Sequence, residues 1–402
     1  MEQILAIFNP WWDRSFKAGG IEREGYIAEL ERRERTKDIV FVVGLRRVGK
    51  TTLMHQYIEH LIKRGNDPRR ILYFSMDHPA LARESILDTL DAYRRAHGFK
   101  HDDRFTVIID EAHLREGFEQ ELKAIYDLGR VKVFATGSSS LSLVERGSNL
   151  IGRQSFMEVF PFGFQEYLGI KRLKFRQSDS HLMVRYAEDY VRSGGLPEYL
   201  KTGDPNYVTT MMDAVLYKDI AARRGVRNMM ALRELLLIIT QSTGSKVSPR
   251  KIGRTLGISH ETVREHLSQF EESNLIHTVR YDGKVSESMA SPRKLYLSDT
   301  GVAHVLSPTI NLGSLVENCV FNALRSRGGE IKYGIVRGSE VDFILSDSCY
   351  EVKYSDNVAS EEVAHLRGVD VRSRTVVTKG KSGHSNGIDF VPLWRFLTDW
   401  QK

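Results

Sequence analysis

The segment from Gly44 to Thr51 constrains the fold of this 402-residue chain more than any other feature. It reads Gly-Leu-Arg-Arg-Val-Gly-Lys-Thr and fits the pattern G-x-x-x-x-G-K-[ST] in full. An apolar run at 39–43 precedes it and a helical pattern at 51–63 follows it. We therefore expect a buried strand, a glycine-rich loop and a helix in succession, the arrangement that lets backbone N–H groups curl around a phosphate.

The loop predicts an ATP site that also holds Mg²⁺. Lys50 is placed to reach the β- and γ-phosphates, and the Thr51 hydroxyl is placed to bind the metal. A chance glycine-rich turn is the alternative, but the flanking strand and helix favour the nucleotide site. The candidate nucleotide-binding residues are Gly44, Arg46, Arg47, Val48, Gly49, Lys50, Thr51 and Thr52.

Two adjacent acids follow the apolar run at 107–109. Asp110, at the tip of this expected strand, can hold Mg²⁺ directly or through water, and Glu111 is placed to polarise an attacking water. A second acid beside the metal ligand favours hydrolysis over mere binding. The alternative is an ordinary solvated acidic turn, and we interpret the nearby His113 as structural.

Small hydroxyl residues follow the next expected strand, at 131–135. Ser138, and after it Thr136, could hydrogen-bond the γ-phosphate or the attacking water. A helix N-cap is the competing interpretation for Ser138 and its neighbours.

The first half of the chain alternates short apolar runs with helical patterns, which predicts a parallel α/β sheet. The expected strands are 39–43, 71–74, 107–109 and 131–135, and the expected helices are 51–63, 81–96 and 118–128. Residues 160–240 read as mostly helical, including 181–193 and 206–221. We place domain boundaries near 170, near 230 and at 302–313, where Pro308 and Gly313 interrupt the pattern.

Residues 248–297 predict a winged helix. Ser248 caps a helix to Leu256, a Gly-Ile-Ser turn follows, and Ser259 caps a second helix to Glu272. Strands at 275–279 and 294–297 would form the wing. If this unit binds DNA, the side chains expected to face the groove or meet phosphates are His260, Thr262, Arg264 and His266, and Arg250, Lys251 and Arg254. The acids on the second helix oppose this, and a protein-interaction or lid role is the alternative.

The tail contains a helix with Glu317, then Asp342 on one expected strand and Glu351 and Lys353 on the next. Glu351 and Lys353 share a strand face, and Asp342 can converge with Glu351 on one Mg²⁺. Lys353 could then activate water. The pattern resembles the PD-(D/E)xK nuclease fold, which implies metal-dependent cleavage or, alternatively, an inactive binding module.

Together with Asn9-Pro10-Trp11-Trp12, these motifs resemble the AAA+-related ATPases common in archaea and bacteria. The resemblance implies an α/β P-loop core at 1–170 with sheet order 5-1-4-3-2. It further implies a helical lid at 171–230, a winged helix at 231–302 and an α/β restriction-endonuclease-like domain at 310–402.

The same resemblance implies roles for residues outside the loop. Residues 9–12 and Arg23 would lie near the adenine, although aromatic residues there could equally pack a core. Arg153 would be a sensor or trans-acting arginine of a homo-oligomer, or else an ordinary surface arginine. The weaker candidates for that role are Arg223, Arg224 and Arg227.

The composition is that of a folded protein with a net charge of +6, which permits a nucleic-acid partner. No apolar run approaches the ~18 residues needed to cross a bilayer, so we expect no membrane partner and a cytoplasmic location. The two cysteines suggest no zinc framework. The sequence predicts a Mg²⁺-dependent ATP hydrolase that acts on DNA, with a nuclease tail. The alternatives are an ATP-driven regulatory switch with an inactive tail, and an ATPase that remodels protein partners.

Overall fold

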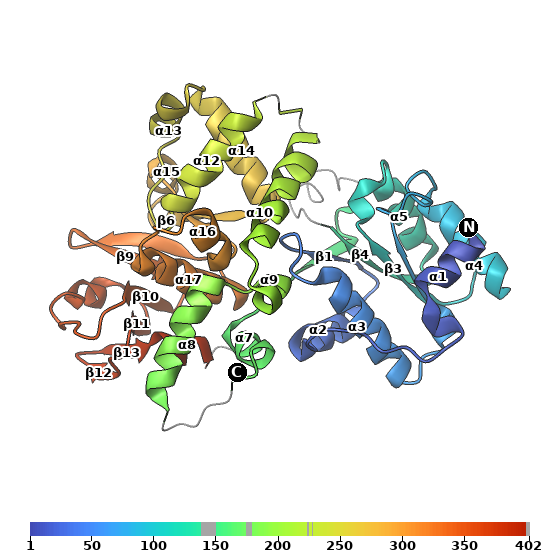
Figure 1. Ribbon diagram of the computed structural model, residues 1–402, viewed down its shortest axis with the longest axis horizontal. Coiled ribbons are helices and arrows are strands. Elements are labelled where there is room, and N and C mark those ends of the chain that lie inside the picture. Colours follow the sequence, from blue (N-terminus) through green and yellow to red (C-terminus); the bar gives the residue numbers. More distant parts are fainter. Residues whose placement is uncertain (138–149, 174–178, 223–224, 227, 399–402) are drawn as a thin grey trace. The chain divides into compact units, whose positions relative to one another are not determined.

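The computed structural model describes residues 1–137, 150–173, 179–222, 225–226 and 228–398. Contacts divide the chain into two compact units, residues 1–159 and residues 160–402 (Figure 1). None of the helices formed by these described residues is long and apolar enough to span a bilayer. The two units are described separately below.

The first unit is built on a parallel sheet of five strands. The strands are β1 (Ile39–Val43), β2 (Ile71–Ser75), β3 (Phe105–Asp110), β4 (Val131–Thr136) and β5 (Gln154–Glu158). Their order is β2-β3-β4-β1-β5, and every pairing is parallel. The expected order 5-1-4-3-2 is therefore confirmed, and the carboxyl ends of all five strands meet at one edge of the sheet.

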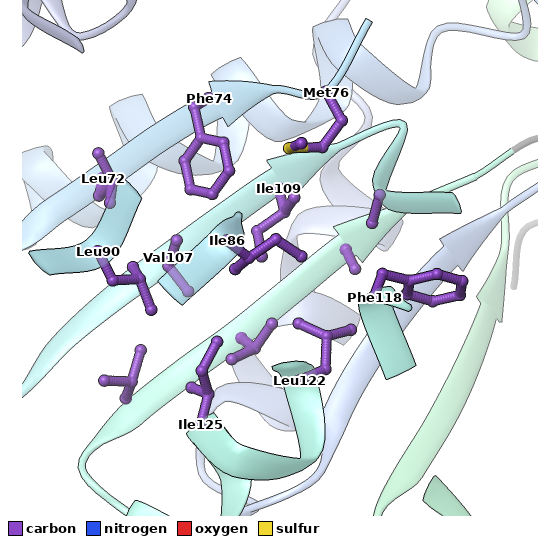
Figure 2. Close-up of a cluster of buried hydrophobic side chains, with 14 of the residues drawn as sticks. Leu72, Phe74, Met76, Ile86, Leu90, Val107, Ile109, Phe118, Leu122 and Ile125 are labelled. Atoms are coloured by element: carbon purple, nitrogen blue, oxygen red, sulfur yellow. The ribbon is translucent and has the colours of Figure 1, made fainter. Parts of the chain in front are cut away.

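Helices cover both faces of this sheet (Figure 1). They are α1 (Glu2–Phe8), α2 (Glu24–Glu34), α3 (Lys50–Lys63), α4 (Ile86–His97) and α5 (Phe118–Leu128). Alternate strand residues such as Phe74 and Val107 join Leu90 and Leu122 in one apolar core under α1, α4 and α5 (Figure 2). On the other face, Tyr57 of α3 packs against Phe134. Because side chains alternate between the two covered faces, each central strand is a continuous apolar run.

The Asn-Pro-Trp-Trp segment closes the free edge of β2. The Asn9 side-chain amide donates to Tyr73 O at 2.8 Å, and its carbonyl oxygen accepts from Tyr73 N at 2.6 Å. The indole N–H groups of Trp11 and Trp12 both donate to Ile71 O at 3.0 Å. Asn9 thus pairs with the edge strand as a neighbouring strand would. Of the two interpretations of this segment, these contacts correspond to the packing of a core.

The second unit begins with helices. These are α7 (Phe164–Ile170), α8 (Ser180–Ser193), α9 (Pro197–Thr202), α10 (Pro205–Ala214) followed by a π-helical stretch (Val215–Ala221), and α12 (Met229–Gln241). Residues 160–170, which were expected in the first domain, make contacts in this unit. Phe162 N donates to Gly195 O at 2.7 Å, and the Phe164 ring contacts Tyr190.

A helix-turn-helix follows, as the sequence predicts. Ser248 accepts from Lys251 N at the start of α13 (Pro249–Leu256), and Ser259 accepts from Thr262 N at the start of α14 (His260–Glu272). Gly257, between the two helices, has φ +64°, a left-handed conformation that glycine adopts without strain.

The rest of the second unit is an eight-stranded sheet with helices packed on it. The strands are β6 (Ile276–Tyr281), β7 (Lys294–Leu297), β8 (Lys332–Val336), β9 (Ser339–Ile344), β10 (Ser348–Lys353), β11 (Ser373–Thr378), β12 (Gly383–Ser385) and β13 (Ile388–Pro392). The helices are α15 (Val285–Ala290), α16 (Thr300–Leu306), α17 (Leu312–Ser326) and α18 (Leu393–Thr398).

The strand order in this sheet is β12-β13-β11-β10-β9-β8-β6-β7. The two strands of the expected wing, β6 and β7, therefore belong to the same sheet as the expected tail. Arg280 and Tyr281 of β6 pair in parallel with Lys332 and Tyr333 of β8. The boundary expected at 302–313 thus falls inside one sheet, and residues 160–402 form one compact unit.

Candidate functional site

The glycine-rich loop joins β1 to α3 in a backbone conformation that depends on its glycines. Gly44 has φ +144°, and a Cβ there would lie 2.3 Å from Val159 O. Gly49 has φ +97°, and it precedes the first residue of α3. A side chain at Gly44 would collide with backbone, and one at Gly49 would be strained. The loop therefore turns tightly at the carboxyl edge of the sheet.

Lys50 lies inside the curl of this loop. Its Nζ donates to Gly44 O at 2.9 Å and to Leu45 O at 3.1 Å, and the side chain is buried. The ammonium is thus at the N-terminus of α3, where the partial positive charge of the helix also lies. Both features attract an anion to the same place.

A hydrogen-bond network ties the loop to the tip of β3. The Thr51 hydroxyl donates to Asp110 Oδ2 at 2.7 Å, and the Tyr73 hydroxyl donates to the same oxygen at 2.9 Å. The Thr136 hydroxyl donates to Asp110 Oδ1. Burial, together with the Asp110 carboxylate, raises the pKa of Tyr73, so its hydroxyl stays protonated and remains a donor. Sequence reasoning missed Tyr73, because nothing in the run Ile-Leu-Tyr-Phe distinguishes it from a core aromatic residue.

The expected Mg²⁺ fits these residues. A hard cation prefers oxygen ligands, and the Thr51 hydroxyl and an Asp110 carboxylate oxygen lie 2.7 Å apart beside the buried Lys50. One ion could touch both oxygens. The sequence prediction of Thr51 and Asp110 as metal ligands is compatible with this geometry.

Glu111 lies immediately beyond the tip of β3 in a left-handed conformation, with φ +51°. Its backbone N–H donates to the Thr136 hydroxyl at 3.0 Å. Its side chain is partly exposed, and Oε2 lies 3.4 Å from Nδ1 of the buried His113. The backbone is thus held by the network around Asp110, while the carboxylate is partly exposed beside His113.

Arg153 lies near the amino ends of the strands, whereas the glycine-rich loop lies at their carboxyl ends. It directly precedes β5, whose Gln154 pairs with Ile39 at the amino end of β1. Five strand residues separate that end from Gly44, a distance of about 16 Å. The Arg153 Nε lies 3.7 Å from Asp127 Oδ1, and its guanidinium lies over the Tyr126 ring. This position favours the trans-acting role over a role at the nucleotide of its own chain, and both stay predictions.

Several other predicted residues are placed as follows. Arg23 is buried with its guanidinium 4.4 Å from the centre of the Tyr26 ring. Thr52 follows Thr51 in α3, and its Cγ2 lies against Gly20. The remaining candidates, Ser138, Arg223, Arg224 and Arg227, lie outside the described residues.

Only some of the helix-turn-helix residues that were expected to contact DNA are exposed. Arg250, Lys251, Arg254 and Arg264 are exposed. His266, by contrast, is buried, and its Nδ1 lies 3.0 Å from Gln269 Oε1. The prediction that His266 faces a DNA groove is therefore wrong, because its face of α14 packs into the second unit.

The second unit also gathers the four residues expected of a nuclease site. Asp342 N donates to Glu351 Oε2 at 3.3 Å, and Lys353 Nζ lies 2.8 Å from Glu351 Oε1. Burial and the nearby Asp342 carboxylate raise the pKa values of both Glu317 and Glu351. The sequence spacing thus predicts correctly that these residues converge.

The expected metal does not fit that cluster. Lys294, the first residue of β7, places its ammonium between Glu317 Oε1 at 2.9 Å and Asp342 Oδ1 at 3.1 Å. In the part of the chain that the structure describes, no group of three or more His, Cys, Asp or Glu side chains is arranged to hold a metal ion. Sequence reasoning missed Lys294 because its partners are far from it along the chain.

Relatives of similar length occur in bacteria and archaea. An uncharacterized protein of Haemophilus influenzae is 25% identical over 398 residues, which are 94% of this chain and 98% of that protein. An uncharacterized protein of Methanocaldococcus jannaschii is 26% identical over 347 residues, 77% of this chain and 73% of that protein. Both resemble this chain over most of its length.

Solved structures resemble parts of this chain weakly. The Saccharomyces cerevisiae Hsp104–ADP complex has a TM-score of 0.35 at 17% identity, covering 64% of this chain and 40% of that one. The replication initiator DnaA bound to AMPPCP and single-stranded DNA has a TM-score of 0.29 at 20% identity, covering 64% and 91%. Both TM-scores lie below 0.5, so neither likeness bears on function.

Two family models match parts of the chain. Residues 184–313 match a model described as a domain of unknown function. Residues 36–168 match a model described as an AAA domain, and this range contains β1 to β5, the glycine-rich loop and the Asp110 network. Most of this match lies in the first unit, where it coincides with the parallel α/β sheet and the P-loop.

Proposed function

We propose that this protein is a Mg²⁺-dependent ATP hydrolase. The observation that carries the proposal is the 2.7 Å hydrogen bond between the Thr51 hydroxyl and Asp110 Oδ2, where Thr51 directly follows Lys50, whose ammonium lies inside the loop. It brings a metal-binding hydroxyl, a metal-binding carboxylate and a phosphate-binding cation to one edge of a parallel sheet. Nucleotide sites of open α/β sheets lie at this edge.

Each residue has a separate task in the proposed reaction. Lys50 and the loop backbone would bind the phosphates, and Thr51 and Asp110 would hold Mg²⁺. When bound, the ion would neutralise part of the phosphate charge. Glu111 would orient and deprotonate the attacking water, because its backbone is held by Thr136 while its carboxylate is partly exposed.

Replacing Thr51 by Val tests this assignment. The change removes the hydroxyl and keeps the size of the side chain, so we expect Mg²⁺-dependent ATP turnover to fall about 10- to 100-fold, or about 1.4 to 3 kcal/mol. Phosphate release from ATP at saturating Mg²⁺ measures it. The matched control is Thr106→Val, the same change at the amino end of β3, which should leave turnover unchanged. Equal turnover in the Thr51 variant and the wild type would remove Thr51 from the metal site.

We further propose that the second unit binds DNA through the helix-turn-helix. Arg250, Lys251 and Arg254 of α13 and Arg264 of α14 all project into solvent, and the chain has a net charge of +6. The exposed Glu261 and Glu265 on α14 would repel phosphates. The proposal therefore gives phosphate contact to the three cations of α13.

A triple replacement of Arg250, Lys251 and Arg254 by Ala tests the DNA contact. Each lost phosphate contact lowers the slope of log K against log salt by about 0.9, so we expect a slope smaller by about 3 and weaker binding to every DNA sequence. Fluorescence anisotropy with a labelled duplex at several salt concentrations measures this. Replacing Arg185, Lys201 and Arg372 by Ala is a control of equal charge change at other exposed positions. An unchanged slope in the α13 variant would exclude α13 from the contact.

For residues 310–402, the expected nuclease-like domain, we propose a binding role in place of DNA cleavage. The contact that favours this choice is the one between the Lys294 ammonium and Asp342, a residue that a nuclease would use to hold its metal. The protein is then an ATP-driven switch whose nuclease-like tail is inactive. Assembly of several copies, with Arg153 acting on the nucleotide of a neighbouring copy, remains part of the proposal.

A further inference from the structure

Lys294 has an unusual environment within the nuclease-like part of the second unit. Its side chain is 2% exposed, and its Nζ lies within 3.1 Å of three carboxylates. These belong to Glu317 at 2.9 Å, Glu340 at 2.7 Å and Asp342 at 3.1 Å. The three acids come from α17 and β9, so the lysine joins β7 to two other elements. An ammonium group has three N–H donors, and here each has a carboxylate oxygen within reach.

Further groups around the cluster pair with its other carboxylate oxygens. Lys353 Nζ lies 2.8 Å from Glu351 Oε1, and Lys246 Nζ lies 2.6 Å from Glu340 Oε2. The Tyr296 hydroxyl donates to Glu317 Oε1 at 2.7 Å, and Val352 N donates to Asp342 Oδ2 at 2.9 Å. Each of the four carboxylates thus has an ammonium partner, with three ammonium groups serving them all.

The ammonium of Lys294 is a permanent part of this arrangement. Three carboxylates within 3.1 Å of its Nζ favour the charged form of this side chain. A buried ion pair of this kind is maintained when each charge keeps its partners, and removing one partner leaves the others uncompensated.

A divalent cation would compete with this ammonium for the same oxygens. Mg²⁺ binds carboxylate oxygens at about 2.0–2.1 Å, so an ion held by Asp342 Oδ1 would lie close to the Nζ that already contacts that atom. Two positive charges at such a separation in a buried site repel strongly. Lys294 cannot move away into solvent without leaving the interior of the sheet.

We propose that the Lys294 ammonium takes the place of a metal ion among Glu317, Glu340 and Asp342, so that this carboxylate cluster is complete without metal. The nuclease-like part of the chain then holds its fold by an internal cation and does not cut DNA by a metal-dependent route. It also contains a latent divalent-cation site, which a neutral side chain at position 294 would uncover. This inference does not depend on ATP hydrolysis by the first unit.

Mn²⁺ titration of the nucleotide-free full chain, followed by electron paramagnetic resonance of free Mn²⁺, tests the proposal. Lys294→Met keeps the length of the side chain and removes the charge. We expect the wild type to show no Mn²⁺ binding that depends on Asp342. We expect Lys294→Met to bind Mn²⁺ at least tenfold more tightly than the wild type, and the double variant Lys294→Met/Asp342→Asn to lose this gain. Lys246→Met removes an ammonium that pairs with Glu340 and lies over the Tyr333 ring, and it should give no such gain.

Two results would overturn the proposal. One is Mn²⁺ binding, or Mn²⁺-dependent DNA cleavage, by the wild type that Asp342→Asn abolishes. The other is a folded Lys294→Met variant that binds Mn²⁺ no better than the wild type. If Lys294→Met does not fold, Lys294→Gln offers a polar neutral replacement. Comparing Mn²⁺ binding by the wild type and by Asp342→Asn is sufficient to test whether the wild-type cluster binds a metal ion.

Discussion

Replacing Glu111 by Gln is expected to slow ATP hydrolysis about a thousandfold while leaving ATP binding within about twofold of the wild type. The amide keeps the shape of the side chain but cannot accept a proton from water, and general-base catalysis typically contributes about 10²–10⁴-fold. The backbone at this position is held by Thr136, so the change should not disturb the loop around it. Single-turnover phosphate release and binding of a fluorescent ATP analogue measure the two effects separately.

Glu116→Gln is the matched control for this experiment. Glu116 lies five residues further along the same connection and is exposed, so the identical chemical change there should leave turnover unchanged. Lys50→Ala gives the contrasting outcome, because it removes the cation inside the loop and should weaken ATP binding as well. Turnover by Glu111→Gln at the wild-type rate would exclude Glu111 as the base.

The largest effect on stability is expected from Asp299→Ala in the second unit. Asp299 is 3% exposed, and its carboxylate accepts from Gly195 N at 2.6 Å and from Val302 N at 2.9 Å. It thus caps α16 and joins it to the end of α8. Losing the cap costs about 0.5–2 kcal/mol, and each buried donor left without an acceptor costs about 1–3 kcal/mol. We expect the free energy of unfolding to fall by about 3 kcal/mol, measured by urea denaturation followed by circular dichroism.

The pH dependence of Asp299 provides a second test of the same site. Burial raises its pKa from 3.8 to about 6, against the lowering effect of its backbone hydrogen bonds. Because the folded-state pKa lies above the unfolded value, the folded state binds more protons between these pH values. The stabilisation from this proton is complete below about pH 3.8 and is lost as the pH rises through about 6.

Asp299→Asn removes this titration. Relative to the wild type, the variant should therefore become more stable as the pH is raised from 4 to 6, by up to about 3 kcal/mol. Asp204→Asn is the control, since Asp204 is also a helix N-cap, accepting from Asn206 N, but is exposed. A pH-independent difference between the wild type and Asp299→Asn would show that Asp299 does not titrate in this range.

The sequence predicts the first unit well because the central strands are buried on both faces. A continuous apolar run identifies β1 as residues 39–43, and the helix at 118–128 follows its own periodicity. The edge strand β5 was not predicted. It reads Gln-Ser-Phe-Met-Glu, and most of its side chains are only partly buried, so it lacks an apolar run.

Some residues of the candidate sites could likewise be predicted from the sequence, and others could not. Lys50, Thr51 and Asp110 follow from local motifs, because a strand, loop and helix that are contiguous in sequence fix their positions. Tyr73 joins the site through the register of β2 against β3, and Lys294 joins its cluster through a sheet. No short pattern encodes such distant contacts. From the sequence, Lys294 was interpreted as a residue of the wing. In the structure, its charge is the most buried in the carboxylate cluster of the second unit.

The continuous sheet of the second unit limits where recombination can exchange segments of this chain. Strand β6 pairs with both β7 and β8, and Lys294 joins β7 to acids on α17 and β9. A recombination event between residues 297 and 312 would bare two strand edges and separate a buried ammonium from its counter-ions. We therefore expect the segments on either side of residues 297–312 to be inherited together, as one unit.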